Sequence, residues 1–388
     1  MAGRTFLCRL VLYAVFSITV ISLFTKSGAP SFFYRYSNSA ALQREEIFCP
    51  QSELADDVLV VLRTGATESR EKLPVHFRTT LRCVPHFVVF SDLDETVEGH
   101  EVHDVLGWSN LLEYLGGFDE SKSYYIGKHL YINDVEFGYG GAGFVLSNPA
   151  MRKVSEQRSA NLHHYEEFTQ SHWVGDCALG KVLEDVKVPL HRGFPHFQSD
   201  SPATVDPAVM KIDRDLWCYP TITYHHVSPT EIDELWRFEQ DWYKQHEIVL
   251  RHRDVFISHV RPKIGASVSY WDNMSVDAEY NAHDHASSPN KEEREAWKSF
   301  AHCRALCESQ NKCIQFSFDS GSCSISNSFR LGYAKPNEKV KSGWMTDRVD
   351  DLFRTLDDRC GIRDWFTPAN EGVNAKIKTQ STMRRQRR

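Results

Sequence analysis

"DDVLVVLRTGATES", residues 56–69, contains an apolar run, Val58 to Leu62, followed by a glycine turn. An unbroken run of this kind is typical of a strand that is buried on both faces. "HFVVFSDLDE", residues 86–95, repeats the pattern and ends in acidic residues. Residues 71–82 can form a helix between the two runs, although Pro74 restricts where it begins. The three segments predict a β-α-β unit, whose ligands bind beyond the carboxyl ends of the strands.

Length and charge set the broad class of the protein. The chain has 388 residues, which is enough for two or three domains, and a formal net charge of −7. An acidic balance argues against a nucleic-acid-binding protein, so we expect no nucleic-acid partner. The basic residues near the C-terminus are confined to a tail at 363–388, which we interpret as a solvated terminus.

The N-terminus predicts a membrane anchor. Residues 10–25, "LVLYAVFSITVISLFT", carry no charge, with Arg4 and Arg9 before them and Lys26 after them. This pattern favours a signal anchor at 1–26 with the short N-terminus in the cytoplasm, followed by a polar stem at 27–55. A cleaved signal peptide is the alternative. Both interpretations place the rest of the chain in an oxidising compartment.

The cysteines agree with that compartment. Four of the ten cysteines fall within 21 residues, namely Cys303, Cys307, Cys313 and Cys323. This density predicts a small disulfide-rich α+β module at 291–362, with a helix followed by the alternating hairpin "NKCIQFSFDSGSCSIS". Zinc is the alternative, but the cysteine spacings are irregular. Asn273-Met-Ser is a glycosylation sequon that a secretory compartment could use.

Several further motifs can carry chemistry. "WSNLLEYLGG" at 108–117 predicts a short amphipathic helix, and "YYIGKHLYIN" at 124–133 predicts a strand. "FGYGGAGFVLSNPAM" at 137–151 is rich in glycine, which suits either a close approach to a ligand or a plain turn. Asp176 precedes an apolar helix pattern, so it is either a helix cap or a functional carboxylate.

The segment before residue 230 ends in a histidine pair. "LWCYPTITYHHV" at 216–227 predicts a β-rich run that places His225 and His226 at a strand end, where they either bind a ligand or are structural. Ser228, Pro229 and Glu231 then form a helix start with a capping box. Residues 251–290 predict an irregular linker, and we expect the histidines in its "NAHDHASSPN" segment to be solvated.

The order of these motifs carries a family resemblance. "VVLRTGATE", "HFVVFSDLDE", "GGAGFVLS", "VGDCALGKVL" and "PTITYHHV" resemble, in that order, the Fringe-like glycosyltransferases of family 31. The fungal branch, related to core 1 β-1,3-galactosyltransferases, is the most similar. The resemblance covers roughly residues 56–245, and the predicted glycosyltransferase domain is 56–250. The cysteine module resembles a PAN/Apple domain, which commonly binds partners or sugars.

The resemblance implies an α/β fold of the GT-A type, with a Rossmann-type nucleotide-binding sheet. It implies an inverting transfer of a hexose from a UDP-sugar to a glycan or glycoprotein hydroxyl, forming a β-1,3 link. It also implies a Golgi type II membrane protein whose N-terminal helix crosses the membrane. Asp176 matches the catalytic base, and His225 matches a ligand of the divalent cation, usually Mn²⁺. The positions that match the nucleotide and the cleft-shaping box are Thr64, Gly65, Asp92, Gly140, Gly141, Ala142 and Gly143.

One part of the family pattern is absent between Leu106 and Gly107. The family places a strand with an acidic metal-binding motif directly before a helix like "SNLLEYL", whereas "HDVLG" stands there in this sequence. Asp92-Leu-Asp94 spells the motif but lies on the preceding predicted strand. One hypothesis is an active transferase whose sequence skips a coding segment. The alternatives are a catalytically inactive relative that binds glycan or protein, and an unrelated secreted adhesion protein.

Overall fold

A computed structural model of the chain describes residues 47–49, 52–64, 73–91, 107–172, 174–211, 214–246, 248–360 and 365–367. The described chain has mixed α/β content and falls into two compact units. The first unit includes 119–193, and the second includes 49–118 and everything from 194 onward. The predicted anchor at 1–26 lies outside the described residues. In the described ranges, no helix is long and apolar enough to cross a bilayer.

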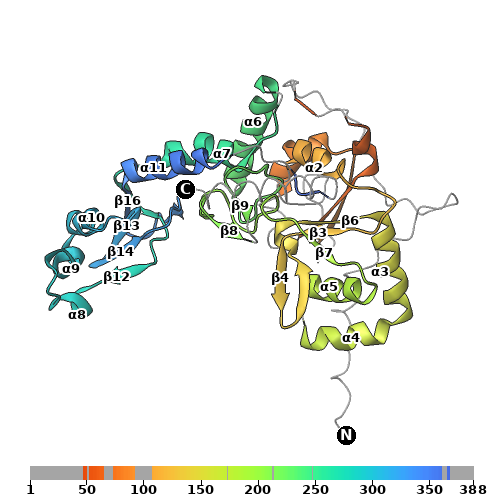
Figure 1. Cartoon of the computed structure of the whole chain (residues 1–388), viewed down its shortest axis with the longest axis horizontal. Helices are drawn as coiled ribbons and strands as arrows, with labels where there is room; N and C mark the ends of the chain where they lie inside the picture. The colour runs from red at the N-terminus through yellow and green to blue at the C-terminus, as the bar shows by residue number, and fades with distance from the viewer. Residues whose placement is uncertain are drawn as a thin grey trace, which may run out of the picture. The chain divides into compact units, whose positions relative to one another are not determined.

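The first unit is built on a three-stranded sheet with the order β6-β3-β7. β3 (Tyr125–Gly127) pairs antiparallel with β6 (Phe144–Leu146) and parallel with β7 (Leu190–Arg192). Three helices accompany this sheet (Figure 1), and they are α3 (Asn148–Ala160), α4 (Leu162–Ser171) and α5 (Gly175–Asp185). Their apolar side chains meet the strand in one core that includes Tyr125, Val154, Tyr165 and Leu183.

A hairpin and a glycine turn complete the first unit. β4 (His129–Ile132) pairs antiparallel with β5 (Val135–Gly138), so the strand predicted at 124–133 is divided between β3 and β4. The short helix η3 (Gly140–Ala142) follows β5. α3 then begins after Ser147, whose side-chain oxygen accepts a hydrogen bond from the Ala150 backbone amide. Pro149 lies in the first turn of the helix, where no backbone amide is needed.

The predicted β-α-β unit is present at the start of the second unit. β1 (Leu59–Thr64) pairs in parallel with β2 (His86–Ser91), and residues 73–78 are helical. η1 (Glu53–Asp57) precedes β1, and η2 (Thr80–Cys83) precedes β2. The expectation of a strand buried on both faces is wrong for β1, because Leu59 is 46% and Val61 is 53% exposed. The described chain gives this pair no third strand.

Two helices of the second unit are joined by a hydrogen bond from the Tyr243 hydroxyl of one to the Asn110 side-chain oxygen of the other. They are α2 (Trp108–Leu115) and α6 (Pro229–Gln245), and α6 begins with the predicted capping box of Ser228 and Glu231. The Asn110 side-chain amide donates to the carbonyl oxygens of Thr221 and Leu250 at 2.5 and 2.8 Å. The segment 216–227, which we expected to be rich in strands, forms two isolated β-bridges instead, Thr223 with Phe197 and Pro220 with Arg251. Its backbone pairs with two separate loops, so no continuous strand forms.

The cysteine module contains a five-stranded antiparallel sheet with the order β10-β16-β13-β14-β12. Its predicted hairpin is confirmed, and the helix before it is α10 (Phe300–Ser309). The predicted disulfides are confirmed as Cys303–Cys323 and Cys307–Cys313, so these four sulfur atoms are not zinc ligands. The strands are β10 (Val268–Ser269), β12 (Ala278–Tyr280), β13 (Gln315–Asp319), β14 (Ser322–Ser326) and β16 (Lys341–Trp344).

Residues 251–290, which we expected to form a linker, instead contribute to the module. β10 and β12 from this segment are the two edge strands of its sheet. They have two and three residues, so they are too short to show an alternating pattern in the sequence. The other elements here are α7 (His252–Val255), η4 (Phe256–Val260), η5 (Arg261–Lys263), β11 (Trp271–Asp272), α8 (Ala282–His285), α9 (Lys291–Glu295) and η6 (Ala296–Lys298).

The sequon at Asn273 lies in the interior of the module. Asn273 is fully buried, and its amide nitrogen donates to the carbonyl oxygens of Phe316 and Gly343 at 3.1 and 3.2 Å. Ser275 is also buried and donates to the Asn273 side-chain oxygen. The sequon is therefore inaccessible in the folded protein, which corrects the expectation of a usable glycosylation site.

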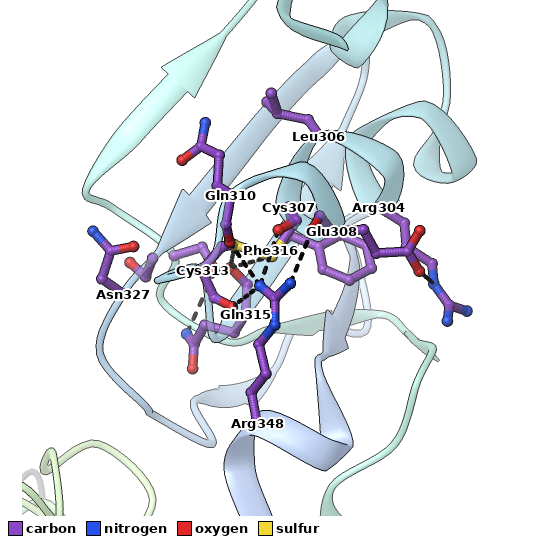
Figure 2. Close-up of a disulfide and its surroundings, with 12 residues drawn as sticks. Arg304, Leu306, Cys307, Glu308, Gln310, Cys313, Gln315, Phe316, Asn327 and Arg348 are labelled. Atoms are coloured by element: carbon purple, nitrogen blue, oxygen red, sulfur yellow. Dashed lines mark hydrogen bonds and ion pairs between the residues drawn. A yellow bond between two sulfur atoms is a disulfide. The ribbon is translucent and has the colours of Figure 1, made fainter. Parts of the chain in front are cut away.

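Arg348 fastens the smaller disulfide loop to α11 (Thr346–Asp358), as Figure 2 shows. Its Nη1 donates to the carbonyl oxygens of Cys307, Gln310 and Cys313 at 3.1, 2.7 and 2.7 Å. Its Nη2 donates to the Glu308 carbonyl oxygen at 2.9 Å. One guanidinium thus donates to carbonyl groups at the C-terminal end of α10 and in the loop that follows it, where a cation is favourable.

The module shares its core with the residues that precede it. One cluster joins Leu216, Trp217 and Phe256 to Trp344 and Phe353, and the Cys218–Cys360 disulfide closes it. Part of the predicted tail also belongs to the second unit, because Trp365, Phe366 and Thr367 are buried. The remaining strands are β8 (Met210–Lys211), β9 (Arg214–Asp215) and β15 (Tyr333–Ala334).

Candidate functional site

The glycine turn and Asp176 meet in the first unit. Asp176 lies in the first turn of α5, and its Oδ2 accepts a hydrogen bond from the Gly140 amide at 2.7 Å. The two residues are 36 positions apart, and the sequence presents them as separate motifs. The N-cap residue of α5 is Val174, so Asp176 does not occupy the cap position. The structure brings the two predicted motifs together at one point.

A side chain at position 140 would displace the Asp176 carboxylate from its present position. A Cβ atom at position 140 would lie 2.7 Å from both Asp176 carboxylate oxygens, which is closer than real Cβ atoms approach. Gly143 has φ 75°, a conformation that side chains with a Cβ rarely adopt. Gly141 and Ala142 complete the turn between these two positions, and Ala142 is buried.

Tyr125 holds the end of β5, from which the glycine turn starts, by a hydrogen bond. It lies on β3, it is buried, and its hydroxyl oxygen accepts a hydrogen bond from the Gly138 amide at 2.6 Å. Burial raises the pKa of the Tyr125 phenol, so this group stays neutral at physiological pH. Tyr125 is not among the site residues that the sequence predicts, because a tyrosine in a strand gives no signal that separates packing from support of a site.

Cys177 follows Asp176 and faces the interior. It is a free thiol, it is fully buried, and it packs with Val135 and Phe137 of β5. Burial raises the pKa of the Cys177 thiol, and the charge of Asp176 raises it further. Cys177 is thus a packing residue that holds the start of α5 against the hairpin, and it is not a nucleophile.

A polar network lies on the hairpin beside the turn. Arg192 Nε donates to Glu136 Oε1 at 2.7 Å, and Arg192 Nη2 donates to the Tyr131 hydroxyl at 2.6 Å. The Tyr131 hydroxyl in turn donates to Glu136 Oε1 at 2.9 Å. Because β7 carries Arg192 and the hairpin carries the other two residues, the network fixes the hairpin to the sheet.

His225 belongs to the second unit. It is half-buried, and its ring centroid lies 4.0 Å from that of His226, which has φ 57°. The preceding residue, Tyr224, is buried and hydrogen bonds through its hydroxyl to His252 Nδ1 at 2.6 Å. The buried hydrogen bond between Tyr224 and His252 therefore fixes the backbone next to His225.

Of the residues predicted to bind the nucleotide, the structure describes Thr64 but not Gly65 or Asp92. Thr64 is the last residue of β1 in the second unit, where a β-α-β unit presents its ligand-binding end. Gly65, Asp92 and Asp94 lie outside the described residues. Within the described ranges, no three histidine, cysteine, aspartate or glutamate side chains are grouped to hold a metal ion.

The contacts of Asp176 suit one chemical role. The Gly140 amide and the N-terminal end of α5 both stabilise negative charge on Asp176. A carboxylate fixed in this way can accept a proton from a hydroxyl that is bound next to it. The chain matches no protein-family model and no curated protein sequence, so this assignment stands on the residues and their geometry.

Proposed function

We propose that this protein is an inverting glycosyltransferase that moves a hexose from a UDP-sugar, such as UDP-galactose, to a glycan or glycoprotein hydroxyl in a β-1,3 link. Asp176 is the general base in this proposal. The observation that carries it is the hydrogen bond between Asp176 and Gly140, which joins the two most specific motifs of the sequence at one point.

The proposed chemistry needs a carboxylate that stays in place. The acceptor hydroxyl loses its proton as its oxygen attacks the anomeric carbon of the donor, the bond from that carbon to the UDP oxygen breaks, and UDP leaves. Asp176 takes the proton. Gly140 holds one carboxylate oxygen, and Tyr125 holds the strand end from which the glycine turn starts. General base catalysis by a positioned side chain typically contributes about 10²–10⁴-fold to the rate.

The nucleotide side of the proposal rests on Thr64, Gly65 and Asp92 at the ends of β1 and β2. Mn²⁺ is the proposed cofactor, with His225 as one ligand. The described residues do not supply a complete set of ligands for such an ion, so no step of the mechanism is derived through it. The half-exposed Leu59 and Val61 of β1 agree with the proposal that a neighbouring strand is missing after Leu106.

The cellular setting follows from the disulfides and the predicted anchor. Cys49–Cys83, Cys218–Cys360 and the two module disulfides are typical of an oxidising compartment. We therefore propose a Golgi type II membrane protein with its catalytic domain in the lumen.

The alternative is an inactive relative that binds glycan or protein. The exposed side chains of β1 also favour this candidate. If the protein truly lacks the neighbouring strand and the metal ligands on it, it would bind its ligand without transferring a sugar. Binding through the cysteine module does not require the first unit to be active.

The test compares UDP-sugar turnover in the natural chain and in Asp176→Asn, each with Mn²⁺ present. The asparagine keeps an oxygen for the Gly140 amide but cannot act as a base. We expect turnover to fall by roughly 10²–10⁴-fold and UDP binding to change less than about twofold. Glu156→Gln is the matched control, because Glu156 is an exposed carboxylate on α3.

Three outcomes are informative. Loss of UDP binding in Asp176→Asn would contradict its role as a base. Absence of turnover in the natural chain, together with turnover in a chain extended by in-frame transcript sequence between Leu106 and Gly107, would show that the sequence skips a segment. Absence of turnover in both chains, with UDP or glycan binding retained, would support the inactive relative.

A further inference from the structure

Gly180 lies at a close contact between α5 and β5. It is a buried residue in the middle of α5, where a glycine is a weaker helix former than an alanine. A Cβ atom on Gly180 would lie 2.5 Å from the Phe137 Cβ atom and 2.9 Å from the Glu136 carbonyl oxygen. The first of these atoms is attached directly to the backbone of β5 and the second is part of it, so neither can move unless the strand moves.

β5 is held in place by several hydrogen bonds. All four of its residues pair with β4. The Gly138 amide donates to the Tyr125 hydroxyl oxygen at 2.6 Å, and Arg192 Nε donates to Glu136 Oε1 at 2.7 Å. These bonds tie β5 to the hairpin and to two strands of the sheet. A side chain at position 180 would therefore displace α5 rather than β5.

The C-terminal half of α5 is fixed as well. Val182 and Leu183 are buried in the core of the first unit, together with Tyr125 and Tyr165. The Tyr165 hydroxyl also donates to Asp185 Oδ2 at 2.9 Å. A push at Gly180 would therefore be taken up by the first turn of α5.

The first turn carries Asp176 on the same face of the helix as Gly180, because residues four positions apart are neighbours on a helix surface. Carbon atoms are in comfortable contact at about 3.5–4.0 Å, so an alanine at position 180 would move this face by about 1 Å. Asp176 Oδ2 lies 2.7 Å from the Gly140 amide nitrogen. A further separation of about 1 Å takes these atoms beyond the range of a hydrogen bond.

We propose that Gly180 is a positioning residue for Asp176. Because it has no side chain, α5 approaches β5 closely enough for the Asp176 carboxylate to reach the Gly140 amide. Its effect on sugar transfer rests on the proposed function, in which Asp176 is the general base. Its effect on the hydrogen bond does not, so the two effects can be tested separately.

The first test measures hydrogen exchange of the Gly140 amide in the full chain. We expect exchange to be about tenfold faster in Gly180→Ala, because a hydrogen bond to a charged group is lost. Asp176→Ala removes the acceptor and gives the size of the full effect. Glu184→Ala is the matched control, because Glu184 lies on the exposed side of the same helix.

The second test measures UDP-sugar turnover. A misplacement of about 1 Å can cost about 10²-fold in rate, so we expect Gly180→Ala to lower kcat by about that factor. The KM for the UDP-sugar should change less than about twofold, because the residues proposed to bind the nucleotide are not on α5. In an Asp176→Asn background, Gly180→Ala should lower turnover no further, because the base through which it acts is already lost.

A second variant covers the case in which Gly180→Ala does not fold. Cys177 packs with Phe137 at the same contact, nearer the start of α5. Cys177→Val places a larger side chain there, so it should also speed exchange of the Gly140 amide, by a smaller factor than Gly180→Ala. Exchange of the buried amides of the α5 core shows whether each variant is folded.

Three outcomes would overturn the inference. The first is an unchanged Gly140 exchange rate in folded Gly180→Ala or, if that variant does not fold, in Cys177→Val. The second is faster exchange with an unchanged kcat, and the third is a further fall in turnover when Gly180→Ala is added to Asp176→Asn. Faster exchange in Gly180→Ala, together with no turnover in the natural chain, would contradict the proposed function and still support the positioning of Asp176 by Gly180.

Discussion

The five-stranded sheet of the cysteine module and the parallel pair β1–β2 differ in how they are covered. Phe316 and Ile325 of the module sheet are buried, and two disulfides fasten α10 in place. β1 has an equally apolar sequence, yet Leu59 and Val61 are half-exposed. Antiparallel hairpins carry their partners nearby in the sequence, whereas a parallel pair depends on elements supplied from elsewhere. An apolar run therefore predicts a strand better than it predicts what covers that strand.

The largest effect should come from the disulfide that closes the shared core. Cys218 and Cys360 are 142 residues apart, so replacing both by serine should cost about 5 kcal/mol of unfolding free energy through loop entropy. Replacing Cys307 and Cys313 should cost about half as much, because their loop spans only six positions. Guanidinium chloride unfolding measures both values, and equal losses would contradict the loop argument.

Truncating one side chain in each sheet tests the comparison directly. Phe316→Ala removes a fully buried ring and should cost about 3–5 kcal/mol. Val61→Ala removes a half-exposed side chain and should cost less than about 1 kcal/mol. Chemical denaturation followed by tryptophan fluorescence gives both differences. A large loss in Val61→Ala would show that β1 is covered in solution.

Arg348→Ala should release the smaller disulfide loop from α11. Four carbonyl groups would lose a charged donor, and we expect a loss of about 2–3 kcal/mol. Arg348→Lys keeps the charge but not the planar fork, so it should recover only part of this loss. Arg354→Ala is a matched control, because Arg354 lies on the exposed side of the same helix. Thermal unfolding of the three variants is the measurement.

Acid should destabilise the second unit through His252. This histidine is fully buried between Tyr224 and the Pro195 carbonyl oxygen, and burial lowers its pKa to about 3. The unfolded chain binds a proton near pH 6.5 and the folded chain does not, so stability falls as the pH drops from about 6.5 toward 3. We expect this group to contribute a loss of about 2 kcal/mol between about pH 6 and pH 4.

The pH effect can be assigned by comparing two histidines. His252→Asn should reduce the slope of unfolding free energy against pH, although its stability at neutral pH will be lower. His163→Asn should leave the slope unchanged, because His163 is an exposed residue of α4. An unchanged slope in His252→Asn would remove His252 as the cause.

Local patterns predicted many elements correctly. The β-α-β unit, the capping box at Ser228, the helix of Cys303 and the hairpin after it are all present. Contacts between distant residues were not predictable. The pairing of Cys218 with Cys360 and the bond between Gly140 and Asp176 depend on the whole fold, and no local pattern encodes them. The edge strands β10 and β12 are too short for periodicity to indicate them.

The buried Asn273 makes folding and glycosylation mutually exclusive at one nitrogen atom. The atom that a glycan would modify is the atom that donates to Phe316 and Gly343 inside the module. A glycan added during synthesis would keep the module sheet from closing, and a module that closes first hides the asparagine. Glycan occupancy at Asn273 would therefore record which of the two events came first in each molecule.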